Sequence, residues 1–580
     1  MKYLLTALNA KYIHSNPALY SLRAYARQHC AVDVAGVEIA EYTINQSVDD
    51  IAASIYEKAP DLIAISCYIW NWRMVQDLIR ILGVILPGVP LWLGGPEVSF
   101  HTEELLQKFP ELTGVMAGEG EKTFTQLLEY YDSKTSGVTA SLAQIPGIVY
   151  RDEKTGAVCR TGERELTDLN SIPFFYEDME DFANRIVYYE SSRGCPYRCS
   201  YCLSSIDKKV RLRDLNLVKR ELQFFLDHKV PQVKFIDRTF NCDHHHAQEI
   251  WRYIREHDNG ITNFHFEVAA GILNAEELEL LSKMRPGLVQ LEIGVQTTNA
   301  KTLDAIRRRE NLDKLQEIIA VLHAGGNIHL HLDLIAGLPY EDLESFKHSF
   351  NQVYGMRPSQ LQLGFLKVLK GAHMEEMAEE YGLAYQQTPP YEVLSTKWIS
   401  YKELRLLKQV EEMVELFYNS GQFTRTVPEL ENCFDTPFAL YEALAHFYKE
   451  KGYAVNNPSR MERYRLLLAF ACSIAPGEEQ KWKELLTFDL YLRENCKSRP
   501  EFAPDLEEYK AAIQDFYRKE ELERRFLGEY EGYNSRQLQR MTHVEVFSHP
   551  VRKAVLFDYQ KRNPLDDNAV IHEIVLEEML

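Results

Sequence analysis

The sequence predicts an α/β protein in which two strand-helix regions are followed by a mostly α-helical C-terminal region. Short apolar runs alternate with helical periods in residues 1–135 and again in residues 186–370. From about Gly371 the pattern changes to long helical periods. With 580 residues, 45% of them hydrophobic, the chain can form several cores. We therefore expect units at 1–135, 186–370 and 371–580, with a hairpin and linker at 136–185.

The first region is expected to form a doubly wound parallel sheet, whose loops gather at the carboxyl ends of the strands and bind ligands there. Its predicted strands are 2–8, 32–37, 62–66, 89–93 and 114–117, and its predicted helices are 17–29, 48–57, 75–85, 103–109 and 123–131. A turn marked by Lys154-Thr155-Gly156 predicts a hairpin at 147–160 in the connector.

The second region is expected to form a partial (β/α)6 barrel with its chemistry at the carboxyl-terminal mouth. Its predicted strands are 186–189, 232–236, 264–269, 288–294, 328–335 and 360–365. Helices are predicted between them at 217–226, 247–256, 275–284, 300–307, 312–323 and 343–354. Polar residues occupy the strand ends, where a pure core would have none: Asp237, Glu267, Glu292, Gln296 and Asp333.

A cysteine loop directly follows the first barrel strand. Cys195, Cys199 and Cys202 have the spacing C-x-x-x-C-x-x-C. Three thiolates can hold three irons of a four-iron cluster and leave the fourth iron open to a small molecule. The alternatives are a chance crowding of thiols or a zinc knuckle, for which the loop has no fourth ligand.

This loop resembles that of the radical S-adenosylmethionine (SAM) superfamily. The resemblance implies a reducible [4Fe-4S] cluster on the three cysteines that binds SAM, with Tyr201 beside the adenine. The barrel motifs resemble the branch that contains oxygen-independent coproporphyrinogen oxidase. That likeness implies SAM contacts by Glu267, Gln296, Arg308 and Asp333, an adenine contact by Ile335, Gly337 and Leu338, and an amino-group contact near Asp237.

The loops of the first region resemble those of cobalamin-binding domains. A serine after the third strand, a Gly-Gly after the fourth and a Gly-Glu-Gly-Glu before a helix imply cobalamin contacts by Ser66, Gly94, Gly95, Glu97 and Glu119. His14 lies in the loop where relatives carry a cobalt-ligating histidine, but Tyr12 and Pro17 replace the aspartate and glycine of that motif. His14 therefore either ligates cobalt or merely helps to close the domain.

Composition bounds the class of protein. The formal charge of -20 argues against an extended nucleic-acid surface, and the scattered remaining cysteines favour a reducing cytoplasm. No signal peptide or membrane-spanning run is predicted. The three histidines after Asp243 point in different directions on a helix, so a solvated helix start is expected there instead of a metal site.

The C-terminal region is predicted to contain helices 374–381, 391–418, 437–451, 460–475, 480–496 and 506–527, then strands 543–547, 554–559 and 570–576. No motif assigns it a role. Together the resemblances imply a cobalamin-dependent radical SAM enzyme that forms a 5′-deoxyadenosyl radical and methylates an unknown small molecule or peptide, using a flavodoxin- or ferredoxin-like reductant. Two alternatives stay open: a rearrangement, oxidation or cyclisation enzyme with a degenerate cobalamin domain, and a non-enzymatic iron-sulfur protein.

Overall fold

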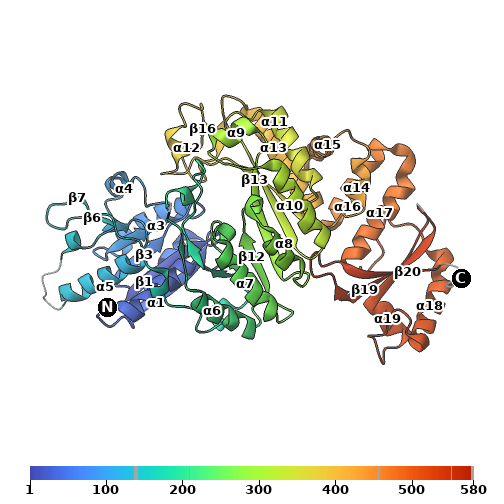
Figure 1. Cartoon of the computed structure of the whole chain (residues 1–580), viewed down its shortest axis with the longest axis horizontal. Coiled ribbons are helices and arrows are strands. Elements are labelled where there is room, and N and C mark those ends of the chain that lie inside the picture. Colours follow the sequence, from blue (N-terminus) through green and yellow to red (C-terminus); the bar gives the residue numbers. More distant parts are fainter. Residues whose placement is uncertain (136–140, 208, 454–457, 550, 576–580) are drawn as a thin grey trace.

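The computed structural model describes residues 1–135, 141–207, 209–453, 458–549 and 551–575. An α/β unit at the N-terminal end and a C-terminal unit lie at opposite ends of an elongated molecule, with the barrel between them (Figure 1). The predicted fold class is therefore confirmed: two parallel α/β sheets and a helical C-terminal region. Among the described residues, no helix is long and apolar enough to cross a membrane.

The first sheet has the strand order β2-β1-β3-β4-β5-β6-β7. Strands β1 to β5 are parallel, and β6 and β7 join them as an antiparallel hairpin. The hairpin predicted in the connector thus extends this sheet to Arg160. The strands are β1 (Tyr3–Asn9), β2 (Val37–Thr43), β3 (Leu62–Ser66), β4 (Leu91–Gly94), β5 (Gly114–Met116), β6 (Ile148–Arg151) and β7 (Val158–Arg160). The helices are α1 (Pro17–His29), α2 (Val48–Glu57), α3 (Trp72–Ile85), α4 (Thr102–Lys108) and α5 (Glu121–Thr135).

The strand predicted at 32–37 is wrong. Residues 31–36 form a turn and loop, in which Val37 N donates to Val34 O, and β2 begins only at Val37. Gly36 ends the short apolar run, and a Cβ there would lie 2.2 Å from the carbonyl oxygen of Met1. The longer alternating run that starts at Val37 forms the strand instead.

The second sheet has the order β15-β14-β13-β12-β11-β8, with all neighbours parallel, as expected for a partial barrel. Its strands are β8 (Val187–Tyr189), β11 (Gln232–Phe235), β12 (Asn263–Glu267), β13 (Val289–Gln296), β14 (His329–Ala336) and β15 (Gln360–Phe365). The helices are α6 (Leu215–Asp227), α7 (His244–Glu256), α8 (Ala275–Ser282), α9 (Ala300–Ala305), α10 (Leu312–Gly325) and α11 (Leu343–Gly355). Asp243 caps α7, as predicted, by accepting from His246 N.

The C-terminal helices share one apolar core with the barrel, in which Leu404, Tyr441 and Trp482 pack with barrel residues such as Phe350. The single helix predicted at 391–418 is wrong, because β17 (Val393–Ser395) precedes α13 (Tyr401–Val414). A capping box of Ser400 and Glu403 fixes the start of that helix. The other elements are α12 (His373–Glu376), β16 (Ala384–Tyr385), α14 (Thr426–Glu431), α15 (Pro437–Glu450), α16 (Arg460–Ile474), α17 (Glu479–Arg493), α18 (Lys510–Glu523) and α19 (Ser535–Met541).

The last described elements form an antiparallel sheet of β18 (Thr542–Phe547), β19 (Lys553–Arg562) and β20 (Ala569–Ile574). These strands lie close to the predicted ones. Residue 576 of the last predicted strand lies outside the described residues. The turn between β19 and β20 packs against the amino-terminal end of the barrel. His329, the first residue of β14, lies beside the Leu565 backbone, and burial lowers the pKa of its imidazole. Pro564 lies over Gly287, where an added Cβ would be 3.0 Å from the Pro564 oxygen.

Candidate functional site

The three cysteines lie in a loop whose neck is a two-stranded antiparallel ribbon. Strand β9 (Ser192–Arg193) leads into the loop and β10 (Arg211–Leu212) leads out of it, with Arg193 opposite Arg211. Gly194 has a φ of +99°, and a Cβ there would lie 2.5 Å from the Lys209 carbonyl oxygen. Glycine is therefore required at position 194 by the backbone conformation and the close approach of the two strands.

Neighbouring elements hold the cysteine loop against the barrel. Ser200 N donates to Ile306 O over 2.9 Å, and Met374 N donates to Ser200 O over 2.7 Å. All three cysteines are free thiols; Cys195 and Cys199 are buried and Cys202 is half-buried. Among the described residues, no three His, Cys, Asp or Glu side chains are arranged around one metal ion. A four-iron cluster does not require that convergence, because each cysteine binds a different iron.

Among the described residues, two buried polar atoms of the predicted SAM contacts lack a hydrogen-bond partner. These atoms are Gln296 Oε1 and Arg308 Nε, whereas Asp333 Oδ1 has an ion-pair partner in His331 Nε2 at 3.1 Å. Gln296 also has a φ of +72°, in a bulge of β13. Unpaired buried polar groups are costly, so this set fits residues that await a polar ligand.

Burial raises the pKa of Glu267 to about 7, against the opposing charge of Arg238. Glu292 and Asp237, in contrast, have protein partners. Glu292 lies 3.1 Å from Lys234 Nζ and 2.9 Å from His265 Nε2. Asp237 accepts from Ser191 N and Ser191 Oγ, just before the cysteine loop.

The remaining barrel candidates lie mainly within the core. Leu338 is fully buried in the apolar core, against which the half-buried Tyr201 and Ile335 pack. Burial raises the pKa of the Tyr201 hydroxyl. Gly337 has a φ of +87°, so its backbone conformation explains the glycine. Whether these residues contact an adenine stays a prediction.

A cavity of about 510 Å³ lies between the first sheet and the barrel. One wall consists of loops at the carboxyl ends of β3, β4 and β5, and it includes Ser66, Gly94, Gly95 and Glu119. The opposite wall includes Tyr188 from the first barrel strand, Glu190 directly after that strand and Leu203 next to the last loop cysteine. Gly95 has a φ of +107°, and a Cβ there would lie 2.5 Å from the Cys67 carbonyl oxygen.

Two predicted cobalamin contacts instead join the first sheet to the barrel. His14 Nδ1 lies 2.6 Å from the Tyr188 hydroxyl oxygen. Glu97 is buried, lies 3.0 Å from Lys370 Nζ and accepts a hydrogen bond from the Tyr391 hydroxyl. Of the acidic and histidine candidates in this domain, Glu119 is thus the one that lines the cavity.

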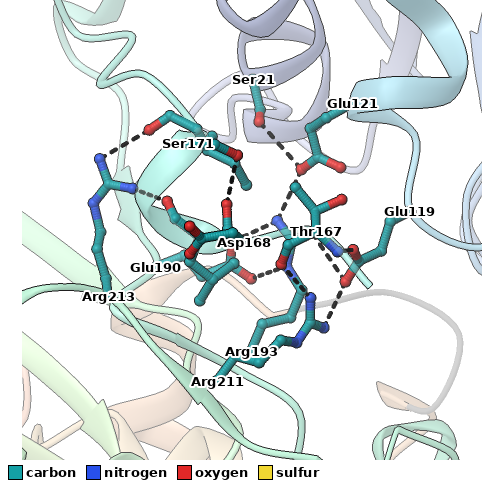
Figure 2. A network of polar contacts seen from close by, with 12 residues as sticks. Ser21, Glu119, Glu121, Thr167, Asp168, Ser171, Glu190, Arg193, Arg211 and Arg213 are labelled. Atoms are coloured by element: carbon teal, nitrogen blue, oxygen red, sulfur yellow. Dashed lines mark hydrogen bonds and ion pairs between the residues drawn. The ribbon is translucent and has the colours of Figure 1, made fainter. Parts of the chain in front are cut away.

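Glu119 also belongs to an ionic network that sequence reasoning missed. It lies 3.3 Å from Arg193 and 2.5 Å from Arg211. Figure 2 shows the three side chains together in this network. Glu121 adds a contact of 2.9 Å to Arg193. Burial opposes ionisation of Glu119, but the Arg211 hydrogen bond and the Arg193 charge lower its pKa to about 2. The signal available in the sequence was the arginine directly before Gly-Cys.

Fold and site together define a class: a cobalamin-type α/β domain joined across a cavity to a barrel with a three-cysteine loop. The family comparisons agree. Residues 3–128 match the B12 binding domain, residues 189–353 match the radical SAM superfamily, and residues 379–565 match a protein family of unknown function, DUF4080. The chain combines B12-binding and radical SAM domains and is homologous to cobalamin-dependent radical SAM methyltransferases. These matches support the expected set of [4Fe-4S] cluster, SAM and cobalamin.

Several curated relatives are methyltransferases. The chain is 27% identical over 355 residues to 2-(S-pantetheinyl)-carbapenam-3-carboxylate methyltransferase of Streptantibioticus cattleyicolor, covering 56% of this chain and 49% of the relative. It is 26% identical over 403 residues to the cobalamin-dependent radical SAM methyltransferase TokK of Streptomyces tokunonensis, covering 62% and 55%. The chain therefore spans about half the length of these relatives.

Solved structures share the fold. The cobalamin-dependent SAM radical enzyme OxsB aligns over 84% of this chain and 78% of its own, with a TM-score of 0.58 and 16% identity. Coproporphyrinogen III oxidase from Escherichia coli aligns over 40% of this chain and 52% of its own, with a TM-score of only 0.28 and 17% identity. The expected likeness to that branch is only weakly supported.

Proposed function

We propose that this chain is a cobalamin-dependent radical SAM methyltransferase. The observation that carries the proposal is the shared cavity, because loops of the cobalamin type and segments next to the cysteine loop form opposite walls of one space. A methyl carrier and a radical source must both reach the same substrate atom, and such a space permits that.

In this proposal each group of residues has a distinct task. Cys195, Cys199 and Cys202 ligate three irons of the cluster and leave the fourth for SAM. Glu267, Gln296, Arg308 and Asp333 orient SAM, since carboxylates suit its ammonium and ribose hydroxyls and a guanidinium suits its carboxylate, while Gln296 Oε1 and Arg308 Nε have no hydrogen-bond partner among the described residues. Ser66, Gly94 and Gly95 leave room for cobalamin beside the sheet. When bound, the cofactors supply a 5′-deoxyadenosyl radical and a methyl group, while the protein orients them and excludes water.

The substrate is a small molecule or peptide of unknown identity. A flavodoxin- or ferredoxin-like protein of low potential supplies the electron, and the reducing cytoplasm is the proposed location because the seven cysteines outside the cluster loop are scattered and not paired as in a disulfide framework. The residue boundaries 1–135, 136–185, 186–370 and 371–580 remain our proposed domain limits.

The test is anaerobic reconstitution of the full chain with iron, sulfide and cobalamin, followed by an optical spectrum and an assay for 5′-deoxyadenosine. We expect cluster and corrinoid absorption and reductive cleavage of SAM in the wild type and in Cys433→Ala, which changes an exposed thiol. Cys199→Ala should lose both the cluster absorption and the cleavage. SAM cleavage without bound corrinoid would favour the rearrangement, oxidation or cyclisation enzyme, and a cluster without cleavage would favour the non-enzymatic protein.

A further inference from the structure

The neck of the cysteine loop brings two positive charges together. Arg193 and Arg211 are direct partners across the β9–β10 ribbon, which is only two residues long on each side. Like charges directly opposite each other destabilise an antiparallel pair. Such a short ribbon therefore needs a counter-charge to keep the two ends of the loop together.

Glu119 supplies a counter-charge that bridges both arginines. Its Oε1 lies 3.3 Å from an Arg193 guanidinium nitrogen and 2.5 Å from one of Arg211, while its Oε2 accepts from Thr167 N at 2.7 Å. Glu190 contacts Arg193 and Asp207 contacts Arg211, each at 2.7 Å. These two acids lie within the barrel segment, whereas Glu119 comes from the loop between β5 and α5 of the cobalamin-type domain.

We propose that Glu119 is a positioning residue for the cluster loop, acting through Arg193 and Arg211. The cobalamin-type domain thereby helps to set the positions of the three cysteines, which the barrel alone does not fully determine. This inference rests on the proposed function, since it requires a cluster on that loop. It replaces the cofactor contact that the sequence predicts for Glu119 by a link between the two domains.

Burial and hydrogen bonding favour this role. The Glu119 side chain is 16% exposed, and both of its oxygens already accept from or pair with protein groups. A carboxylate has about four acceptor positions, so three partners leave little capacity for a ligand. The linker takes part as well, because Arg211 donates to the Thr167 carbonyl at 2.8 Å. The amide of the same residue, Thr167, donates to Glu119.

The test compares Glu119→Gln with Glu103→Gln in the reconstituted full chain. Both changes remove one negative charge from the same domain. Glu103, however, lies on α4 and pairs with Arg160 of β7, away from the cysteine loop. Three properties are measured: the rate of iron release to a ferrous chelator, the electron paramagnetic resonance (EPR) spectrum of the reduced cluster with and without SAM, and the corrinoid content. We expect Glu119→Gln to release iron about tenfold faster and to alter the EPR response to SAM, because a partly buried ion network loses its bridging charge.

Corrinoid content should change little in Glu119→Gln, and Glu103→Gln should match the wild type in all three measurements. A second variant, Arg211→Gln, keeps the Glu119–Arg193 pair and removes the repulsion, so it should be milder. Adding Arg211→Gln to Glu119→Gln should recover part of the lost iron retention.

Two outcomes would overturn the inference: iron release unchanged in Glu119→Gln, or loss of corrinoid with the cluster intact. A double variant as defective as the sum of the two single changes would also contradict it. Failure of the proposed function is distinguishable, because the wild type itself would then form no cluster or cleave no SAM.

Discussion

The Tyr188 hydroxyl oxygen lies 2.6 Å from His14 Nδ1 and so connects the first barrel strand to the first loop of the N-terminal sheet. Burial raises the pKa of Tyr188 to about 12 and lowers the pKa of His14, which favours the neutral forms of both at pH 7. If Tyr188 donates to Nδ1, the ring proton of His14 is on Nε2, and that nitrogen then has no lone pair for a metal.

We therefore expect no histidine ligand on the corrinoid cobalt. In the Co(II) form, the EPR spectrum of the loaded protein should lack nitrogen splitting from an axial imidazole, and His14→Ala should give the same spectrum. Tyr188→Phe serves as the matched variant, because it frees Nδ1 without removing the ring. Nitrogen splitting that is present in the wild type and absent in His14→Ala would contradict this expectation.

Glu267 should make the cofactor-free protein less stable as the pH rises. The pKa of Glu267 in the folded protein is about 7, above the ordinary value of 4.5. The buried carboxyl therefore does not lower the unfolding free energy below pH 4.5, where it is protonated in both states. As the pH rises through 7, ionisation of this group increasingly lowers the unfolding free energy. At pH 8 the cost amounts to about 3 kcal/mol. Glu267→Gln should therefore stabilise the apo-protein at pH 8, but not near pH 4.5, and should weaken SAM binding.

Chemical denaturation at the two pH values measures this effect. Glu276→Gln is a suitable control, because Glu276 is largely exposed and lies in the first turn of α8, the helix that follows β12. If Glu267→Gln lowers the unfolding free energy at both pH values, the carboxyl is a structural group instead of one held ready for a ligand.

Gly95 should tolerate no side chain. A Cβ there would meet the Cys67 carbonyl oxygen at 2.5 Å, and the φ of +107° disfavours other residues. Gly88 also has a positive φ, but its Cβ would meet nothing within 4 Å. In urea denaturation we expect Gly88→Ala to cost about 1 kcal/mol through backbone strain and Gly95→Ala about 3 kcal/mol or more, with less corrinoid retained. Equal costs would show that the close approach at Gly95 is relieved by movement of the loop.

Glu97 and Lys370 should act as a docking pair between the first domain and the barrel. Lys370→Met removes the cation beside a buried carboxylate and leaves it with the Tyr391 hydroxyl among the described residues, so we expect a loss of about 3 kcal/mol in unfolding free energy. Adding Glu97→Gln should restore most of it, a coupling that a double-mutant cycle measures. The corrinoid content of the double variant should equal that of the wild type. Loss of corrinoid in Glu97→Gln alone would instead support the cofactor contact predicted from the sequence.

Local pattern was sufficient to predict the two parallel sheets. Helix α1 occupies the range 17–29 that its apolar periodicity predicted, and the six barrel strands follow in the expected order. The errors arose where a local signal was read too broadly. Periodicity from 391 onward was extended across β17, although the Ser400 and Glu403 box marks the true helix start. The strand assigned to 32–37 stopped where the real one begins.

The candidate site was only partly predictable, because several of its contacts join residues far apart in the chain. The cysteine spacing is a local signal, and the sequence alone located that loop. The links from Glu97 to Lys370 and from Glu119 to Arg211 each connect separate domains. Nothing in the local sequence distinguishes a carboxylate that contacts a ligand from one that binds an arginine of the next domain. Only the folded arrangement separates the two.

The β19–β20 turn has a consequence for the barrel itself. Pro564 and Leu565 lie against the barrel floor beside His329 and Gly287, at the end opposite the strand ends that carry the predicted SAM contacts. The C-terminal sheet therefore packs against the starts of β13 and β14. A region without a recognisable motif in this way contributes to the stability of the sheet on which the candidate site is built.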